Sequence, residues 1–295
     1  MTQTGYTDAA AVLPDELRSR AKQMERQWSG LAEEFRLRAG RDASVLLPDG
    51  EHTMLPNRPV SVSDLHTVLE RATGASLHSA YENLRSGFVT TRTGCRVGVC
   101  GSAVCQGDSV KTIRDFSSLS IRIPRQCFGA ADGVYDRLPH SPFPSVLLIS
   151  PPGGGKTTLL RELIRRLSED GHRVCLADER GEVAAVCEGV PRFDVGPCTD
   201  VLTGGIKAVS AVMLIRSMSP QILALDEITA PGDVEACITA ANCGVGILAS
   251  AHASALSDLG TRPLYRRLLE QGIFTHAVMI HNRGRSRTYD VEALT

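Results

Sequence analysis

One short stretch of the sequence has the residue types needed to bind a phosphate group. It consists of Ser150, Pro151, Pro152, Gly153, Gly154, Gly155, Lys156, Thr157 and Thr158. Successive glycines let the backbone close around a phosphate, so that backbone N–H groups and the N-terminus of a helix face its oxygens. Lys156 is then placed to reach the β- and γ-phosphates, and the hydroxyl of Thr157 to bind Mg²⁺. The stretch predicts a phosphate-binding loop (P-loop) that binds ATP.

The elements that must position this loop lie on either side of it. Residues 146–149 are apolar and indicate a buried parallel strand, and the leucines and isoleucine of 159–167 form one face of a helix. A Gly-Pro turn with an incidental lysine is the alternative, but it explains neither flank. Ser150 stands where such loops begin with glycine, at a hinge where a small residue can replace it. We expect the Lys156 ammonium to face solvent while the loop is empty.

The chain from residue 146 onward repeats a pattern of strand, loop and helix. The expected strands are 146–150, 173–177, 222–226, 246–250 and 276–280. This alternation predicts an α/β fold with a parallel sheet covered by helices on both faces. Ligands bind at the carboxyl ends of the strands in such folds.

Polar residues follow several of these strands, where they would meet the P-loop. Asp226 is predicted to be the second acidic partner of Mg²⁺, and Glu227 to polarise a water for attack on the γ-phosphate. A helix cap formed by this Asp-Glu pair is the alternative. His252 is predicted to sense the γ-phosphate, although a lone histidine is often structural. Glu179 and Arg180 either assist a Mg²⁺-bound water or form a salt bridge at a domain interface, and the sequence leaves both open.

The first half of the chain predicts a separate, smaller mixed α/β domain over residues 1–135. Helical patterns cover 11–39 and 62–84, and strands are expected on both sides of the turns at 49–50 and 93–94. Prolines and serines over 136–145 indicate a linker, so the ATP-binding domain is expected to span 146–295.

Composition argues against several classes of function. The formal net charge is −1 and aromatic residues make up 4% of the chain, which disfavours a nucleic-acid track. No apolar run approaches the length of a membrane span, and the first residues lack a signal-peptide pattern. Nine cysteines without an export signal indicate reduced thiols and a cytoplasmic location.

The motifs together resemble those of the stage III sporulation protein AA family. The resemblance rests on 150–163, 177–185, 215–228 and 249–253, in this order and spacing, and extends over about 30–290. It implies a RecA-like motor domain related to the hexameric secretion ATPases of type II and type IV systems. It further implies ATP binding by the P-loop, a Walker B pair at Asp226 and Glu227, an acidic box at 178–180 and a histidine box at His252. The segment after Glu227 departs from the family pattern, which leaves open how hydrolysis would be coupled to motion.

The resemblance also implies a cellular role. The protein would be a motor subunit in a homo-oligomeric ring, with a hexamer as the expected size, that powers a sporulation channel between mother cell and forespore. It would stay in the cytoplasm without inserting into the membrane, and membrane-embedded channel proteins would recruit it. A RecA-like nucleic-acid motor and a nucleotide-binding switch with little turnover remain as alternatives.

A ring ATPase usually takes one arginine from the neighbouring subunit to complete its site. Arg122, Arg125, Arg283 and Arg285 are the candidates. We favour Arg122, because alternation along a strand points it away from the side of Ile121 and Ile123. A solvated surface charge is the alternative.

Overall fold

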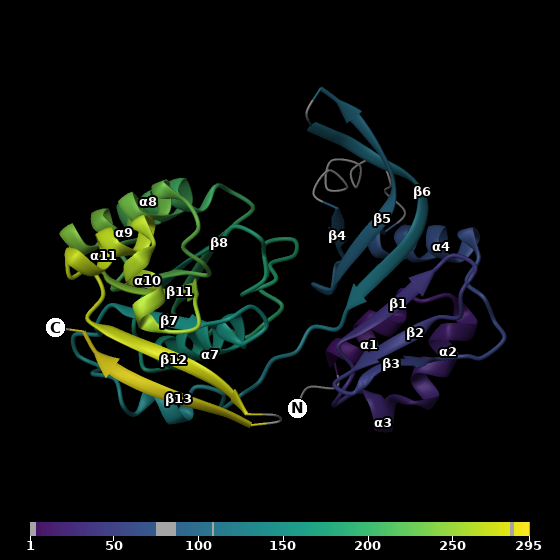
Figure 1. The fold of residues 1–295 in the computed structure, drawn as a ribbon, viewed down its shortest axis with the longest axis horizontal. Helices are drawn as coiled ribbons and strands as arrows, with labels where there is room; N and C mark the ends of the chain where they lie inside the picture. Colours follow the sequence, from purple (N-terminus) through teal and green to yellow (C-terminus); the bar gives the residue numbers. More distant parts are fainter. Residues whose placement is uncertain (1–3, 75–86, 108, 284–285, 295) are drawn as a thin grey trace. The chain divides into compact units, whose positions relative to one another are not determined.

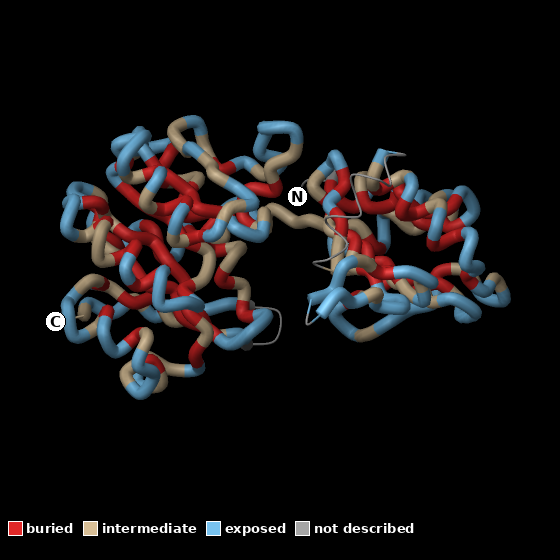
Figure 2. The backbone as a smooth tube through the Cα atoms, turned by 90° about the horizontal axis from the view of Figure 1, so that it is seen from above, coloured by how far each residue is buried: buried red, intermediate tan, exposed pale blue. Residues whose placement is uncertain are grey.

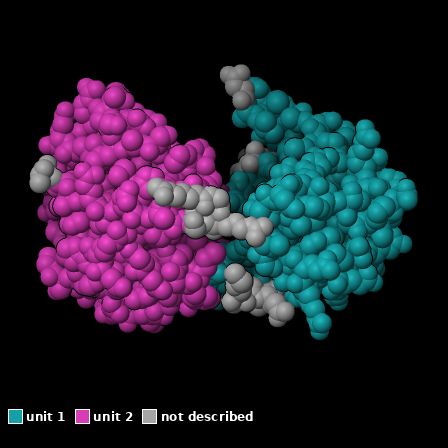
Figure 3. Space-filling model, turned by 60° about the horizontal axis from the view of Figure 1, so that its bottom comes forward, with its two compact units in different colours: residues 1–126, 187–192 teal, residues 127–186, 193–295 magenta. Residues whose placement is uncertain are grey.

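The computed structural model describes residues 4–74, 87–107, 109–283 and 286–294. The chain divides into two compact units, coloured separately in Figure 3. Unit 1 contains residues 1–126 together with 187–192, and unit 2 contains 127–186 and 193–295. Buried residues gather in the interior of each unit (Figure 2).

Unit 1 is a six-stranded antiparallel sheet with helices packed against it (Figure 1). The strand order is β3-β2-β1-β6-β5-β4. Its elements are α1 (Thr4–Ala11), α2 (Asp15–Gln23), α3 (Glu25–Trp28), β1 (Glu34–Arg38), β2 (Ser44–Leu47), β3 (Gly50–Thr53), α4 (Val62–Thr73), β4 (Phe88–Thr90), β5 (Arg96–Gln106) and β6 (Ser109–Arg122).

Helix α4 shows how the sequence sets the ends of an element in unit 1. The hydroxyl of Ser61 accepts the N–H of Asp64, and the carboxylate of Asp64 accepts the N–H of Ser61, which forms a capping box. Gly74 ends the helix in the left-handed region, with φ 63°. The predicted helix over 62–84 therefore ends earlier, and residues 75–86 lie outside the described residues.

Unit 2 is built around a seven-stranded sheet of order β13-β12-β7-β11-β10-β8-β9. Each neighbouring pair from β12 to β9 is parallel, and β13 runs antiparallel at the edge. Its elements are α6 (Asp132–Tyr135), β7 (Val146–Ser150), α7 (Lys156–Glu169), β8 (Val174–Asp178), β9 (Thr199–Thr203), α8 (Lys207–Met218), β10 (Ile222–Leu225), α9 (Pro231–Asn242), β11 (Gly246–His252), α10 (Leu256–Thr261), α11 (Pro263–Glu270), β12 (His276–Arg283) and β13 (Ser286–Ala293).

Helices cover both faces of this sheet, as the alternation of strand residues requires. Leu147 and Ile149 of β7 pack in one apolar cluster with residues of α8, α9 and α11. Val146 and Leu148 pack in the opposite cluster with residues of α6 and α7. The predicted α/β fold class is therefore confirmed.

The division of the chain differs from the predicted one. Val134, Leu138 and Phe143 are buried in the same cluster as Val146, so the segment predicted as a linker over 136–145 packs onto unit 2. The boundary lies after Gln126 rather than at 135, and residues 187–192 group with unit 1. The segment is packed despite its prolines, because the side chains of Leu138 and Phe143 are buried.

Candidate active site

The P-loop connects β7 to α7, and its glycines have separate structural reasons. Gly153 and Gly155 adopt φ 73° and 96°, a region that side chains rarely enter. Gly154 has no room for a larger residue, because a Cβ there would lie 1.8 Å from the Oγ of Ser150. Ser150 is buried at the end of β7 and donates to the carbonyl of Pro151 at 2.8 Å. The structure thus contains the tight turn that the sequence predicted, with serine at its hinge.

The expectation that Lys156 faces solvent is wrong. Its side chain is buried, and its ammonium donates to the carbonyls of Ser150 at 2.9 Å and Pro151 at 3.1 Å. A third contact joins the ammonium to Nδ1 of His252 at 2.6 Å. Burial lowers the pKa of Lys156, while the charges of Glu227 and Asp226 raise it. The lysine turns inward because its own loop and the end of β11 supply acceptors for all three hydrogens.

His252 connects this lysine to the predicted catalytic carboxylate. An ammonium can only donate, so Nδ1 of His252 is the acceptor in that contact and the ring hydrogen sits on Nε2. Nε2 lies 3.1 Å from Oε2 of Glu227 and donates to it. The histidine therefore joins Lys156 at the start of α7 to Glu227 after β10.

Thr157 and Asp226 form the second part of the site. The hydroxyl of Thr157 donates to Oδ1 of Asp226 at 3.1 Å. Burial, followed by the charges of Glu182 and Asp178, raises the pKa of Asp226 to about 6. A hydroxyl and a carboxylate in contact, with excess negative charge around them, are oxygen donors that suit Mg²⁺. Among the described residues, no group of three or more His, Cys, Asp or Glu side chains could hold a metal ion.

The segment after β8 holds further carboxylates near this pair. Asp178 is fully buried and accepts the N–H groups of Glu182 at 3.0 Å and Ala184 at 2.9 Å. Arg161 of α7 donates to the carbonyls of Glu182 at 2.7 Å and Val183 at 2.6 Å. Asp178 therefore shapes the loop, and the loop brings Glu182 to Asp226. The sequence analysis missed Glu182, whose role depends on the turn that Asp178 closes.

The remaining predicted residues lie in different parts of the two units. Oε2 of Glu179 lies 3.8 Å from Nζ of Lys207, so Glu179 makes an ion pair inside unit 2. Arg180 is exposed, and Thr158 lies in the first turn of α7. Arg122 is exposed at the end of β6 in unit 1, opposite the buried Ile121 and Ile123, as alternation predicted.

The other arginine candidates lie elsewhere. Arg125 donates to the carbonyl of Ala32 within unit 1. Arg283 is the last residue of β12, and Arg285 lies outside the described residues.

One arginine that the sequence analysis missed lies beside the P-loop. A Cβ on Gly155 would approach Cζ of Arg287 to 2.6 Å, so the guanidinium from β13 rests against the loop. Arg287 is exposed, and its side chain makes no ion pair or hydrogen bond with the side chains of the described residues. The strand β13 was not predicted, so nothing in the sequence pattern connected Arg287 to the loop.

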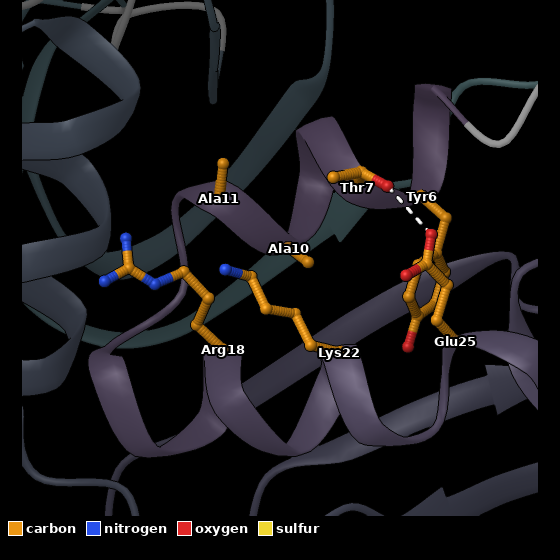
Figure 4. A pocket seen from close by; sticks show the side chains of 7 residues that line it. All are labelled: Tyr6, Thr7, Ala10, Ala11, Arg18, Lys22 and Glu25. Atoms are coloured by element: carbon orange, nitrogen blue, oxygen red, sulfur yellow. Dashed lines mark hydrogen bonds between the residues drawn. The ribbon is translucent and has the colours of Figure 1, made fainter.

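A small cavity of about 160 Å³ lies in unit 1, between α1 and α2. Tyr6, Ala10, Arg18, Lys22 and Glu25 are among the residues around it (Figure 4). The predicted nucleotide-binding residues all belong to unit 2. In the described part of the chain, no helix is both long and apolar enough to cross a membrane.

Comparison with known proteins decides the family. Residues 7–290 match the model of the family described as Sporulation stage III, protein AA. The chain belongs to this family. Stage III sporulation protein AA of Bacillus subtilis (strain 168) is 37% identical over 274 residues, which cover 90% of this chain and 88% of that protein. The family resemblance drawn from the motifs is confirmed.

Solved structures share the fold at low sequence identity. The ATPase DotB of Yersinia pseudotuberculosis superposes with a TM-score of 0.64 at 14% identity, covering 96% of this chain and 80% of that one. The pilus retraction motor PilT with bound ADP also gives a TM-score of 0.64, at 15% identity, covering 95% and 83%. The chain therefore has the predicted fold, which is a P-loop domain like those of these ATPases, preceded by a smaller domain.

Proposed function

We propose that this protein binds ATP with Mg²⁺ and hydrolyses it to ADP and phosphate. The observation that carries the proposal is the meeting of the P-loop with the ends of β10 and β11. Thr157 contacts Asp226, and His252 contacts both Lys156 and Glu227. These are the residue types that phosphoryl transfer needs, on the edge of the sheet where ligands bind.

Each side chain has a role in this proposal. Lys156 and the N–H groups of the P-loop bind the β- and γ-phosphates, and Thr157 and Asp226 hold the metal. Bound Mg²⁺ neutralises charge on the phosphate oxygens. Glu227 accepts a proton from a water whose oxygen bonds to the γ-phosphorus, while the bond from that phosphorus to the β-phosphate oxygen breaks and ADP leaves. His252 senses whether the γ-phosphate is present.

The family and the shared fold support a proposed cellular role. The protein would act in the cytoplasm as a motor subunit of a homo-oligomeric ring, with a hexamer as the expected size. The ring would power a sporulation channel, and membrane-embedded channel proteins would recruit it. Two proteins of similar fold are named as an ATPase and as a pilus retraction motor, which supports a mechanical role.

Two substitutions test the enzymatic proposal on the full-length chain. Glu227→Gln keeps the size and a hydrogen-bonding group but cannot accept the proton, so we expect ATP affinity to be retained and phosphate release to stop. Lys156→Ala should abolish ATP binding, since it removes the charge that faces the phosphates. Calorimetry with ATP and a phosphate-release assay measure both effects.

The same experiment separates a motor from a switch. A wild-type protein that binds ATP tightly but releases no phosphate, alone or with membrane extracts from sporulating cells, would contradict hydrolysis and favour a nucleotide switch. Unchanged ATP affinity in Lys156→Ala, with an unchanged circular dichroism spectrum, would contradict the whole site.

A further inference from the structure

A second lysine lies buried against the main chain of Glu227, the predicted catalytic residue. Lys207 is the first residue of α8, and its side chain is 7% exposed. Its ammonium donates to the main-chain carbonyl of Glu227. The same nitrogen lies 3.5 Å from Oδ2 of Asp233 and 3.8 Å from Oε2 of Glu179. Neither the P-loop nor the metal pair uses this lysine.

The groups around Lys207 depend on its ammonium to different degrees. Asp233 already accepts the N–H groups of Thr229 at 2.9 Å and Ala230 at 3.0 Å, where it caps α9. Glu179 is partly exposed and reaches water. Both carboxylates would therefore keep hydrogen-bond partners without the lysine. The Glu227 carbonyl is the group for which Lys207 supplies a charged donor.

Glu227 is consequently held from two sides. Lys207 binds its carbonyl, and His252 contacts its carboxylate at 3.1 Å. The direction of a side chain follows from the orientation of its own backbone, so a fixed carbonyl restricts where the carboxylate points. A misplacement of about 1 Å at a reacting group can lower a rate by about a hundredfold.

We propose that Lys207 is a positioning residue for Glu227. The proposal rests on the proposed ATP hydrolysis and adds to it a residue outside the P-loop, the Walker B pair and the histidine. Lys207 also joins the ends of two neighbouring strands, because Glu179 follows β8 and Glu227 follows β10. Lys207 thereby connects Glu179 to the main chain of the residue that would activate water.

Lys207→Met tests this assignment, since methionine keeps an unbranched side chain but donates no hydrogen bond. We expect kcat for phosphate release to fall by about tenfold or more, with ATP affinity close to that of the wild type. The loss of one partner from the buried ion pair with Asp233 should lower the melting temperature. The fold should persist, because Asp233 still accepts the N–H groups of Thr229 and Ala230. Lys207→Arg keeps a charged donor and should recover part of the lost kcat.

Arg216 provides a matched control on the same helix. It is exposed in the last turn of α8, far along the helix from Lys207, so Arg216→Met should leave kcat unchanged. A wild-type kcat in Lys207→Met would overturn the proposal. So would a parallel fall of kcat, ATP affinity and melting temperature without recovery in Lys207→Arg, because that pattern describes a merely structural lysine. A wild-type chain without any phosphate release would instead show that the proposed function fails, and the positioning role with it.

Discussion

Asp226 is predicted to bind a metal ion, and its negative charge should lower the stability of the protein when no metal or nucleotide is bound. Burial and the charges of the nearby Glu182 and Asp178 raise the pKa of the Asp226 carboxyl group from 3.8 to about 6. The folded protein therefore disfavours the ionised form. A raised pKa means that the stability associated with the protonated form is present at low pH and is lost as pH rises through about 6. Above that pH the ionised carboxylate weakens the empty fold.

Asp226→Asn removes this charge with little change in shape. The Oδ1 of asparagine can still accept the hydroxyl of Thr157, which donates at 3.1 Å in the wild type. A shift of about two pKa units corresponds to about 3 kcal/mol at pH 7.5, which is an upper value because the empty site can relax. In EDTA and without nucleotide, we expect the variant to be more stable than the wild type by about 1 to 3 kcal/mol.

The pH dependence distinguishes this effect from better packing. The gain should shrink to about half at pH 5 and approach zero near pH 3.5, where the carboxylate is protonated in both folded and unfolded chains. Denaturant unfolding of both proteins at these pH values measures it. Equal stability at pH 7.5, or a gain that does not change with pH, would refute the reasoning.

The nucleotide affinity of Asp226→Asn should change in the direction opposite to its stability. The variant is expected to lose Mg²⁺-dependent ATP affinity, so saturating Mg-ATP should stabilise the wild type more than the variant. Asp178→Asn is the matched control. Its amide group would face the N–H groups of Glu182 and Ala184, which now donate to the carboxylate, so we expect lower stability at pH 7.5 despite the loss of a buried charge.

The remaining predictions concern arginines. Arg287→Ala should weaken ADP and ATP binding by about tenfold in a titration, because the guanidinium rests against Gly155; Arg216→Ala, which removes an exposed arginine of α8, should not, and equal effects would exclude a local contact. Arg122→Ala and Lys156→Ala subunits, each inactive alone, should regain part of the ATPase rate when mixed if Arg122 acts on a neighbouring subunit. No recovery at any ratio, with mixed assembly confirmed by sizing, would exclude Arg122.

The sequence predicted those strands whose residues are apolar on both faces. Residues 146–150 form β7 as expected, because a strand between two layers of helices needs apolar side chains throughout. Edge strands escaped prediction, since β9 is half exposed and reads Thr-Asp-Val-Leu-Thr. The segment 11–39 was predicted to be helical, yet it contains β1, whose buried Phe35 and Leu37 alternate with charged residues. Helical propensity of the neighbouring residues masked that alternation.

The site was predictable to the extent that one local segment determines it. The P-loop glycines are required by their own backbone, and Asp226 and Glu227 follow directly from a buried strand. Glu182, Lys207 and Arg287 were missed, because their contacts join residues that are distant in the chain or depend on a turn. No local pattern reveals that the start of α8 reaches the carbonyl of Glu227, or that β13 returns to the P-loop.

The contacts of Lys156 indicate how nucleotide binding would reach Glu227. A lysine ammonium has three hydrogens to donate, and here they are directed at the carbonyls of Ser150 and Pro151 and at Nδ1 of His252. A phosphate can be bound only if at least one of these acceptors is released. Of the three, His252 also contacts Glu227. If Lys156 released His252 as the γ-phosphate binds, the imidazole ring would be free to reorient. The contacts of this ring with Lys156 and Glu227 would then be enough for it to report the phosphate to Glu227.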